Sequence, residues 1–414
     1  MKPLKLHKGL AEFQKAKKII PGGTLGIRRP YNFVEGEYPI YIDSGKGGHI
    51  TDIDGNKYID YLCAYGPIIL GYREAEVDEA VIKQIRDKGF CFSLTQTLQN
   101  RLAEKLISLI PCAEKCVFVK TGSDATTLAV RIARGYTKKT SVLRCGYHGW
   151  HDWCVEVKGG IPEKLYEDIY EFKYNDLEAA RTLADTHKKD LAAIIVTPLG
   201  HPLAHNIEEP APGFLEGLKE LAKRTDAVLI FDEIRTGFRL AMGGAQEYYG
   251  VTPDLACFGK ALANGYAISA VCGKEPVMNM VEKDVFVSST FFPNSDSYAA
   301  ALKTLEIMER DKVLSHIWKK GNTFLDSLRA IIKKYPLRAE VSGIAPLFFI
   351  TFARDNKKLY KKRRLEFYTQ LIRRGIFMQP YHHSYICYRH SSEDLTKTLK
   401  AIDDSLRVVT DTIG

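Results

Sequence analysis

The chain has 414 residues, of which 45% are hydrophobic and 26% charged, an ordinary composition for a globular protein long enough for two domains. Its formal net charge is +9, and it has no apolar run of the roughly 18 residues that a membrane-spanning helix needs. These figures exclude a membrane-spanning protein and leave room for a buried cofactor.

The start of the chain and the cysteines indicate the compartment. Lysines run through the segment before Pro21, which predicts an amphipathic helix rather than a secretory signal. The nine cysteines show no CxxC pair and no histidine at zinc spacing, so we expect reduced thiols and no metal site. Cys112 and Cys116, the closest pair along the chain, either face each other across a helical turn or, as we favour, are separate buried thiols. We expect a cytoplasmic protein.

The predicted elements change in kind along the chain. Alternating apolar and polar residues around Gly-rich turns predict a small antiparallel meander over 38–61, and helical spacing follows over 74–110. Short apolar strands then alternate with helices, which is typical of a mostly parallel sheet with helices on both faces. The expected strands are 116–120, 141–145, 191–198, 227–233, 255–258 and 267–273, and the expected helices are 124–136, 177–187 and 214–224.

A smaller α+β unit is expected after a long helical stretch that starts near residue 297. Its predicted elements are strands at 347–353 and 385–390, a helix over 359–374 and a final helix from 393. We therefore predict an N-terminal helix and meander (1–60) that belong to the small domain, a large domain (61–310) and a C-terminal small domain (311–414).

A dense basic block, Lys357-Lys358 and Lys361-Lys362-Arg363-Arg364, contributes much of the net charge. It lacks the interleaved aromatic residues of RNA-binding segments and any recognition-helix pattern. A solvated helix face is the favoured interpretation, and a field that attracts an anionic substrate is the second. We expect neither nucleic acid nor a membrane as a partner.

Lys260 and Asp232 carry the main chemical prediction. Asp232 ends the apolar run 227–231, so it should emerge at the carboxyl edge of a buried parallel strand, where open α/β sheets bind ligands. Lys260 follows the next strand in a turn of small residues and is expected to be a buried amine. An amine and an acid at this edge suit pyridoxal 5'-phosphate (PLP), because the amine forms a Schiff base with the aldehyde and the acid keeps the pyridine nitrogen protonated. The alternatives are a surface lysine and a helix-capping aspartate.

Three further segments suit the same cofactor. Gly122-Ser123-Asp124 opens a helix after a strand, so its free amides and hydroxyl suit a phosphate, although Ser123 or Asp124 could simply cap the helix. Tyr147 follows a strand and could stack on a cofactor ring. His148 and His151 are weighed as metal ligands, but no third ligand is evident. Thr290, in a loop, is either a further phosphate donor or a turn residue.

With these motifs in place, the chain resembles the class III aminotransferases of PLP fold type I and is most similar within them to glutamate-1-semialdehyde aminomutases. The resemblance implies a mostly parallel seven-stranded sheet with helices on both faces, a smaller α+β domain and PLP as cofactor. The motifs that carry it are DIDGNKYIDY, YGPIILGY, TGSDAT, RIARGYT, YHG, PGFLEGLKEL, LIFDEIRTGFR, GKALANG and HSSEDL.

Carried over by position, the resemblance implies that Lys260 forms the internal aldimine and that Asp232 pairs with the pyridine nitrogen. Tyr147 would stack on the cofactor ring and Ile234 would pack on its opposite face.

The same resemblance implies that Gly122 and Ser123 hold the phosphate. The threonine that matches Thr290 comes from the neighbouring subunit, so a homodimer is implied. Arg29 falls where the aminomutases bind the substrate carboxylate.

Departures from the family pattern bear on the substrate. Thr197 stands where family members usually carry a glutamate, and the segment after Trp153 is shorter than the mobile lid of the aminomutases. His382 stands near the position of another family glutamate. The residues expected to line the substrate site are Thr197, His201, His382, His383, Tyr385 and Arg389. Their polarity suits a hydroxylated or sugar-like carbonyl compound at least as well as a simple keto acid.

The short lid decides between two reactions. An aminomutase must keep its intermediate enclosed between two half-reactions, which a closing lid achieves. A shortened lid favours release, and therefore a ping-pong aminotransferase with a separate donor and acceptor. An aminomutase, a racemase or epimerase using the same Lys260, and a non-catalytic binding protein stay open as alternatives, and donor and acceptor are not identified by the sequence.

Overall fold

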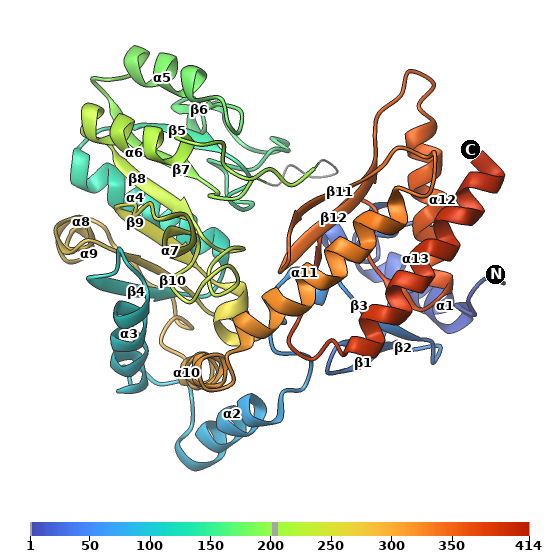
Figure 1. Ribbon diagram of the computed structural model, residues 1–414. Coiled ribbons are helices and arrows are strands. Elements are labelled where there is room, and N and C mark those ends of the chain that lie inside the picture. Colours follow the sequence, from blue (N-terminus) through green and yellow to red (C-terminus); the bar gives the residue numbers. More distant parts are fainter. Residues whose placement is uncertain (1, 201–205, 414) are drawn as a thin grey trace. The chain divides into compact units, whose positions relative to one another are not determined.

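The computed structural model describes residues 2–200 and 206–413 and divides the chain into two compact units (Figure 1). The small unit combines both chain ends, Met1–Glu74 and Ser315–Gly414, with a short piece that includes Ile207. The large unit contains Ala75–Pro202 and Glu208–Leu314. No helix among the described residues is both long and apolar enough to cross a membrane.

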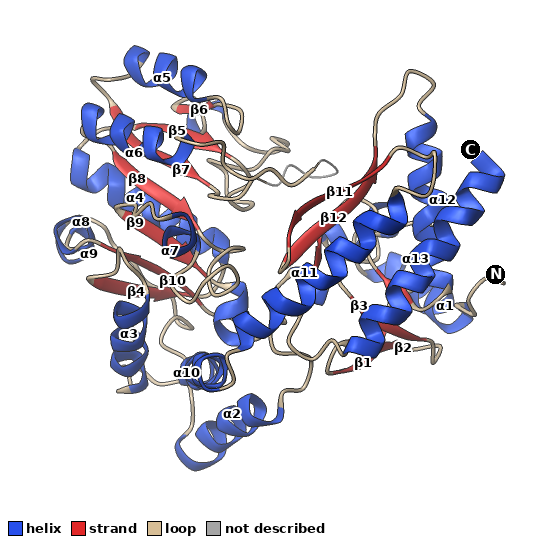
Figure 2. Ribbon diagram, viewed as in Figure 1, coloured by secondary structure: helices blue, strands red, loops and turns tan. Residues whose placement is uncertain are grey.

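A seven-stranded sheet forms the centre of the large unit, which confirms the predicted fold class (Figure 2). Its strand order is β4-β10-β9-β8-β7-β5-β6. The strands from β9 to β6 run parallel, whereas β10 is antiparallel to both of its neighbours. The strands are β4 (Lys115–Val119), β5 (Ser141–Cys145), β6 (Ile169–Glu171), β7 (Leu191–Val196), β8 (Val228–Asp232), β9 (Leu255–Phe258) and β10 (Ser269–Gly273). The sequence did not predict β6.

Helices cover this sheet because its central strands are apolar at nearly every position. Every residue of β7 and β8 is buried, as expected for strands in a parallel sheet with both faces covered. Ala193 and Ile195 of β7 share a hydrophobic cluster with Ala129 and Ile132 of α4, while α6 also packs on β7 and β8. The helices are α2 (Ala75–Lys88), α3 (Leu98–Leu109), α4 (Gly122–Thr137), α5 (Leu177–Thr186), α6 (Phe214–Thr225), α7 (Ala245–Tyr249), α8 (Glu275–Met278), α9 (Met280–Lys283) and α10 (Ser295–Arg310), with 3-10 turns η4 (Glu163–Leu165) and η5 (Lys260–Ala263).

Two helical predictions need refinement. The stretch 74–110 forms two helices, α2 and α3, rather than one continuous run. The stretch that starts near residue 297 forms α10 and, after a break, α11 (Val313–Ile332). Lys312 lies in this break with a positive φ of 50°, which interrupts the helical path.

The small unit contains two sheets. The meander β1 (Ile42–Lys46), β2 (His49–Asp52) and β3 (Lys57–Asp60) is joined by β13 (Ile376–Phe377), which runs parallel to β3. The second sheet has the order β11-β12-β14. Its strands are β11 (Ala339–Ile344), β12 (Leu347–Phe352) and β14 (Ser384–Tyr385), and the other elements of the unit are α1 (His7–Ile19), η1 (Gly26–Arg28), η2 (Pro30–Asn32), η3 (Cys63–Tyr65), α12 (Leu359–Arg373) and α13 (Ser392–Ile413), with most of α11.

The strand predicted over 385–390 is wrong beyond Tyr385. The backbone N–H of Cys387 donates to Nδ1 of His390 at 3.1 Å, and the other ring nitrogen of His390 bonds to the carbonyl of Asp60 at 3.1 Å. These contacts turn the chain before α13, so the amide of Cys387 does not join a strand ladder.

The turn η3 has an unusual backbone. Cys63, Ala64 and Tyr65 have φ values of 48°, 54° and 69°, and Gly66 follows at 104°. Three consecutive non-glycine residues in the left-handed region are costly, because each Cβ crowds the neighbouring carbonyl. The phenol of Tyr65 donates to the carbonyl of Ile27 at 3.1 Å, so the turn fixes this side chain.

The cysteines are all free thiols within the described chain, as favoured for Cys112 and Cys116, of which Cys112 is buried and Cys116 is partly exposed. Cys112 precedes β4, and Cys116 lies within β4 opposite Cys272 of β10. The sulfur atoms of Cys116 and Cys272 are 3.2 Å apart. Cys116 therefore faces a partner 156 residues away across two antiparallel strands.

Candidate active site

Asp232 is the last residue of β8 and lies at the carboxyl edge of the large sheet, as predicted. Its side chain is 4% exposed, so the carboxylate depends on hydrogen bonds within the protein. Oδ1 accepts from the backbone N–H of Ile234 at 3.1 Å, and Oδ2 pairs with Nδ1 of His148 at 2.8 Å. An ionised carboxylate only accepts, so Nδ1 of His148 carries the proton of this bond.

His148 is the functional residue whose role the sequence did not reveal. It lies in the turn after β5, its ring is buried parallel to Trp153, and its carbonyl accepts from Oγ1 of Thr126 at 2.6 Å. His151, weighed with it as a metal ligand, instead bonds through Nδ1 to Oγ1 of Thr127 at 2.8 Å. The signal that could have found His148 is its place at the carboxyl end of β5, which is two strands from Asp232 in the sheet order.

Lys260 opens η5, directly after β9, and is largely but not fully buried. Its φ is 44°, a left-handed conformation that only a fixed turn stabilises for a lysine. Burial is the main cause that lowers the pKa of its amine to about 8; the charge of Arg235 also lowers it, while Asp232 acts in the opposite direction. The amine is therefore neutral in a substantial fraction of molecules near neutral pH, which a nucleophile or proton carrier requires.

The N-terminus of α4 keeps two amides available for an anion. Thr121 and Asp124 form a capping box, in which Oγ1 of Thr121 accepts from the N–H of Asp124 and the carboxylate of Asp124 accepts from the N–H of Thr121. Asp124 is thus a cap, as the alternative interpretation had it. Among the described residues, no hydrogen-bond acceptor pairs with the amides of Gly122 and Ser123, and both point out of the positive end of a 16-residue helix.

Gly122, Ser123 and Ile234 lie close together at this helix end. A Cβ on Gly122 would come within 3.0 Å of the Ile234 side chain. Oγ of Ser123 accepts from the N–H of Trp150 at 3.2 Å, and a Cβ on Gly149 would come within 2.4 Å of that oxygen. The glycine in the YHG motif thus lets the turn after β5 approach α4.

Tyr147 and Thr197 lie at the carboxyl ends of neighbouring strands, β5 and β7. Tyr147 is 49% exposed, which leaves surface of its ring available for stacking. Thr197 is buried, and its hydroxyl has no hydrogen-bond partner among the described residues. A Cβ on Gly146 would come within 2.5 Å of that hydroxyl, so Thr197 is packed tightly against the turn that carries Tyr147.

Thr290 and His201 were also predicted for the site. Thr290 is exposed in the loop after α9, and no contact within the described part of the chain joins it to the other candidates. His201 lies outside the described residues.

Arg29 and His382 belong to the small unit. Arg29 donates to the hydroxyl of Tyr31 at 3.4 Å. The ring of His382 stacks on His383 at 4.0 Å between centroids and meets the ring of Tyr65 edge-on at 5.1 Å. Of the other expected lining residues, Tyr385 is fully buried and bonds to His383 at 2.5 Å, and Arg389 pairs with Glu74.

A buried carboxylate next to Asp232 holds the segment after β8 in place. Glu233 is fully buried and accepts from the N–H of Ala245 at 2.7 Å, from the N–H of Gln246 at 3.1 Å and from the hydroxyl of Thr236 at 2.6 Å. Burial raises the pKa of Glu233, and these donors act against that shift. The segment that carries Asp232 and Ile234 is therefore anchored to the start of α7.

The large unit thus collects an amine of lowered pKa, a buried carboxylate with a histidine partner and a helix end open to an anion. This set can form a Schiff base with an aldehyde, hold a proton on a ring nitrogen and bind a phosphate.

Comparisons with known proteins agree with this chemistry. A family model described as aminotransferase class-III matches residues 31–406. The chain is 59% identical over 406 residues to the 3-aminobutyryl-CoA aminotransferase of Cloacimonas acidaminovorans (strain Evry), with 98% of each chain covered. It is 35% identical to the glutamate-1-semialdehyde 2,1-aminomutase of Methanosarcina acetivorans, with 97% of this chain and 99% of the relative covered.

A solved structure extends the likeness to three dimensions. The PLP internal aldimine form of the Sphingopyxis sp. MTA144 FumI protein matches with a TM-score of 0.93 at 30% sequence identity, covering 97% of this chain and 96% of that chain. Both units take part in a match of this extent.

Proposed function

The chain belongs to the class-III aminotransferase family and is a PLP-dependent aminotransferase, and we propose that its amino donor is a 3-aminoacyl thioester of coenzyme A such as 3-aminobutyryl-CoA. The observation that carries this proposal is the 59% identity, spread over 98% of both chains, to a 3-aminobutyryl-CoA aminotransferase. The aminomutases share 35% or less, which fits a common cofactor chemistry with a different substrate.

The residues of the large unit fit PLP. Lys260 would hold the aldehyde through its amine, Asp232 would hold the ring nitrogen through its carboxylate, and the open amides of Gly122 and Ser123 at the start of α4 would hold the phosphate. When bound, PLP supplies an electron-accepting ring that stabilises negative charge on the substrate carbon next to the nitrogen.

Each protein group then has a defined task. The amine of Lys260 would attach the cofactor and, once free again, would take the proton from the donor carbon. Asp232 would keep a proton at the ring nitrogen, and His148 would orient that carboxylate through its Nδ1–H. Tyr147 and Ile234 would hold the ring between them.

The chemistry of the thioester determines which part of each substrate Arg29, Thr197 and His382 would bind. A 3-aminoacyl thioester has no free carboxylate, so Arg29 would bind the carboxylate of the second substrate, the amino acceptor. Thr197 has a buried hydroxyl that can bond to the thioester carbonyl. His382 would also contact the substrate.

We also propose a cytoplasmic homodimer with shared active sites. The free thiols, of which most are buried, suit a reducing compartment. Mixing Lys260→Ala and Thr290→Asp subunits tests the sharing, because a heterodimer would rebuild one intact site from Lys260 of one subunit and Thr290 of the other. Recovery of activity on mixing supports it, and no recovery would contradict it.

The function itself is tested by a half-reaction. The PLP-loaded protein is mixed with 3-aminobutyryl-CoA and no acceptor, while the visible absorbance of the cofactor and the mass of the products are followed. We expect the absorbance to fall as the cofactor takes up the amino group and 3-oxobutyryl-CoA to form in equal amount. Free 3-aminobutyrate serves as the control for the thioester.

The alternatives give different results in this assay. An aminomutase would convert glutamate-1-semialdehyde with no added donor and leave the thioester unchanged. A racemase would invert or scramble the donor carbon without leaving an aminated cofactor. Either result would replace the proposal.

A further inference from the structure

The loop after β12 and the first turns of α12 form a basic segment, defined as residues 354–364. It contains seven cationic side chains and a single carboxylate, Asp355. That carboxylate accepts from the N–H groups of Leu359 at 3.0 Å and Tyr360 at 2.8 Å, so it caps the helix.

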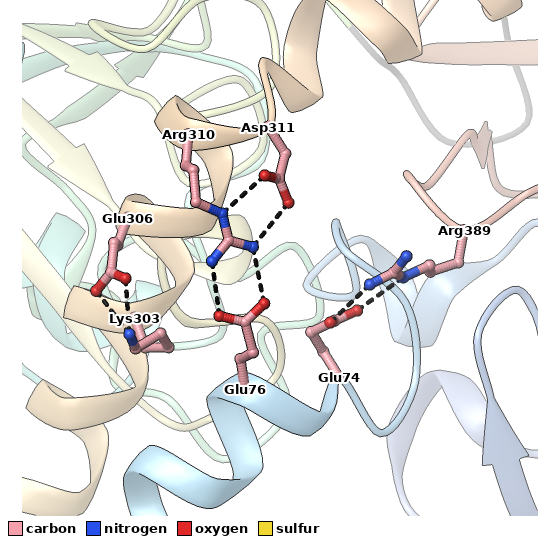
Figure 3. A network of polar contacts seen from close by, with 7 residues as sticks. All are labelled: Glu74, Glu76, Lys303, Glu306, Arg310, Asp311 and Arg389. Carbon is pink, nitrogen blue, oxygen red and sulfur yellow. Dashed lines mark hydrogen bonds and ion pairs between the residues drawn. The ribbon is translucent and has the colours of Figure 1, made fainter.

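The lysines of the basic segment are not neutralised within the described residues. Lys357, Lys358, Lys361 and Lys362 are exposed, and no described carboxylate lies within ion-pair distance of their amines. Other cations of the protein do pair with carboxylates, as Figure 3 shows. In the large unit, Arg310 binds both Glu76 and Asp311. Within the small unit, Arg389 holds Glu74 through two nitrogens, at 2.9 and 2.7 Å.

The basic segment is joined to the segment that carries the predicted substrate residue His382. Arg364 is buried and donates to the hydroxyl of Thr351 at 2.7 Å. The centre of its guanidinium lies 5.5 Å from the ring of Tyr381, the residue before His382, and 6.0 Å from the ring of Tyr360. The start of α12 and the residues around His382 are therefore packed together within the small unit.

We propose that the basic segment binds the phosphate groups of the coenzyme A part of the substrate. This inference rests on the proposed function, which supplies a substrate with a diphosphate and a 3'-phosphate far from the reacting amine. Ammonium groups suit phosphates as mobile point charges, and four neighbouring lysines with no described carboxylate partner gain from an anion because it relieves their mutual repulsion. Glutamate-1-semialdehyde carries no phosphate, so an aminomutase has no use for such a cluster.

The test compares two thioesters, 3-aminobutyryl-CoA and 3-aminobutyryl-pantetheine, of which the second lacks the phosphates together with the adenosine that they carry. In the variant Lys357→Ala/Lys358→Ala/Lys361→Ala/Lys362→Ala, we expect KM for the CoA thioester to rise about tenfold with kcat unchanged. KM for the pantetheine thioester should stay the same. Added salt should raise KM for the CoA thioester in the wild type and have less effect in the variant.

A matched control removes the same charge elsewhere. The variant Lys188→Ala/Lys189→Ala/Lys219→Ala/Lys223→Ala changes four exposed lysines of the large unit and should leave both KM values unchanged. Equal effects of the two variants on the CoA thioester, or equal effects of the first variant on both thioesters, would overturn the proposal.

A binding measurement separates this inference from the proposed function. Coenzyme A without an acyl group is titrated into both proteins by calorimetry, and the wild type should bind it about tenfold more tightly than the four-lysine variant. If the wild type binds coenzyme A in this way but does not turn over the thioester, the proposed function fails while the basic segment stands. If coenzyme A binding is unchanged and binding of a short DNA duplex is lost, the proposal gives way to nucleic acid.

A second inference comes from the thiols of Cys116 and Cys272. They lie directly opposite each other on antiparallel strands, with sulfur atoms 3.2 Å apart. The Cα atoms of such cross-strand pairs lie within the range that a disulfide spans. Cys272 is fully buried, whereas Cys116 is partly exposed on β4, the edge strand of the sheet.

We infer that this pair is a site of oxidation by hydrogen peroxide or a related hydroperoxide. The sulfur of Cys116 attacks one peroxide oxygen, which forms a sulfenic acid and releases one water. The thiol of Cys272 then displaces the sulfenic oxygen, which forms the disulfide and releases a second water. Two thiols are oxidised by two electrons, and the peroxide is reduced.

Peptide mapping under non-reducing conditions tests this step. Peroxide treatment of the PLP-loaded protein should link the peptides of Cys116 and Cys272, and a thiol reductant should reverse the link. In Cys272→Ser, a sulfenic acid at Cys116 should be trapped by dimedone. Oxidation confined to Cys91, the exposed cysteine, or an intermolecular link would overturn the inference.

Discussion

The candidate cofactor residues of the large unit and the candidate substrate residues of the small unit are held by different kinds of structure. Asp232 lies at the end of a fully buried strand and has two hydrogen bonds, and Lys260 follows the neighbouring strand. Arg29 lies between two short 3-10 turns, and its side chain donates a long hydrogen bond to Tyr31, at 3.4 Å. In this chain a buried sheet fixes the candidate cofactor groups, whereas short turns and loops carry the candidate substrate groups.

The largest expected effect is at Lys260. Lys260→Ala should lower amino transfer by at least about four orders of magnitude, because both cofactor attachment and proton transfer depend on this amine. Turnover and the amount of cofactor that stays covalently attached to the unfolded protein after borohydride treatment measure this. Lys274→Ala, which removes a lysine paired with Asp254 on the surface, should keep both.

The second effect is at Asp232. Asp232→Asn removes the charge that holds a proton on the ring nitrogen, so the rate should fall by about three orders of magnitude while cofactor binding largely remains. Single-turnover absorbance measures the rate, and equilibrium dialysis measures the binding. Wild-type rates in this variant would show that another group protonates the ring.

The lowered pKa of Lys260 predicts a pH profile for cofactor attachment. Only the neutral amine attacks an aldehyde, so the attachment rate should rise about tenfold per pH unit below the pKa of about 8 and become level above it. The rate at which the apoprotein gains visible absorbance with added PLP measures this. A rise that continues to about pH 10 would indicate an ordinary lysine.

The variant His148→Asn tests how much the hydrogen bond between His148 and Asp232 contributes to the rate. His148→Asn should lower the rate about tenfold, since the buried carboxylate loses its orienting partner. His151→Asn, in the same turn but bonded to Thr127, is the matched control and should be nearly silent. Equal losses in the two variants would indicate a general disturbance of the turn.

An effect confined to one substrate is expected in the small unit. Arg29→Ala should raise KM for a carboxylate-bearing amino acceptor about tenfold and leave KM for 3-aminobutyryl-CoA unchanged, because the thioester has no free carboxylate. Steady-state kinetics with each substrate varied in turn measure both values. A change in the KM of the thioester alone would assign Arg29 to the other half-reaction.

The sequence was sufficient for features that depend on local pattern. The apolar run before Asp232 predicted a buried strand and its carboxyl edge, and the strand–turn–helix pattern at Gly122 predicted the open helix end. Contacts between residues far apart in the sequence could not be predicted from local pattern. The bond between His148 and Asp232 joins residues 84 apart, and the register that sets Cys116 against Cys272 depends on how β10 enters the sheet.

The strand predicted over 385–390 failed for a related reason. Its apolar and aromatic residues suit a strand, but the N–H of Cys387 donates to the ring of His390. The chain therefore turns at this point. A side chain that bonds to a backbone group competes with the strand ladder, and spacing alone does not reveal such competition.

The left-handed turn at Cys63, Ala64 and Tyr65 has a consequence for protein engineering. If His382 has its proposed role, stability and turnover should change in opposite directions there, since glycine would relax the backbone while losing the ring that Tyr65 sets against His382. We expect a mutant library sorted for soluble yield to enrich glycine at position 65, and the same library sorted for turnover to discard it.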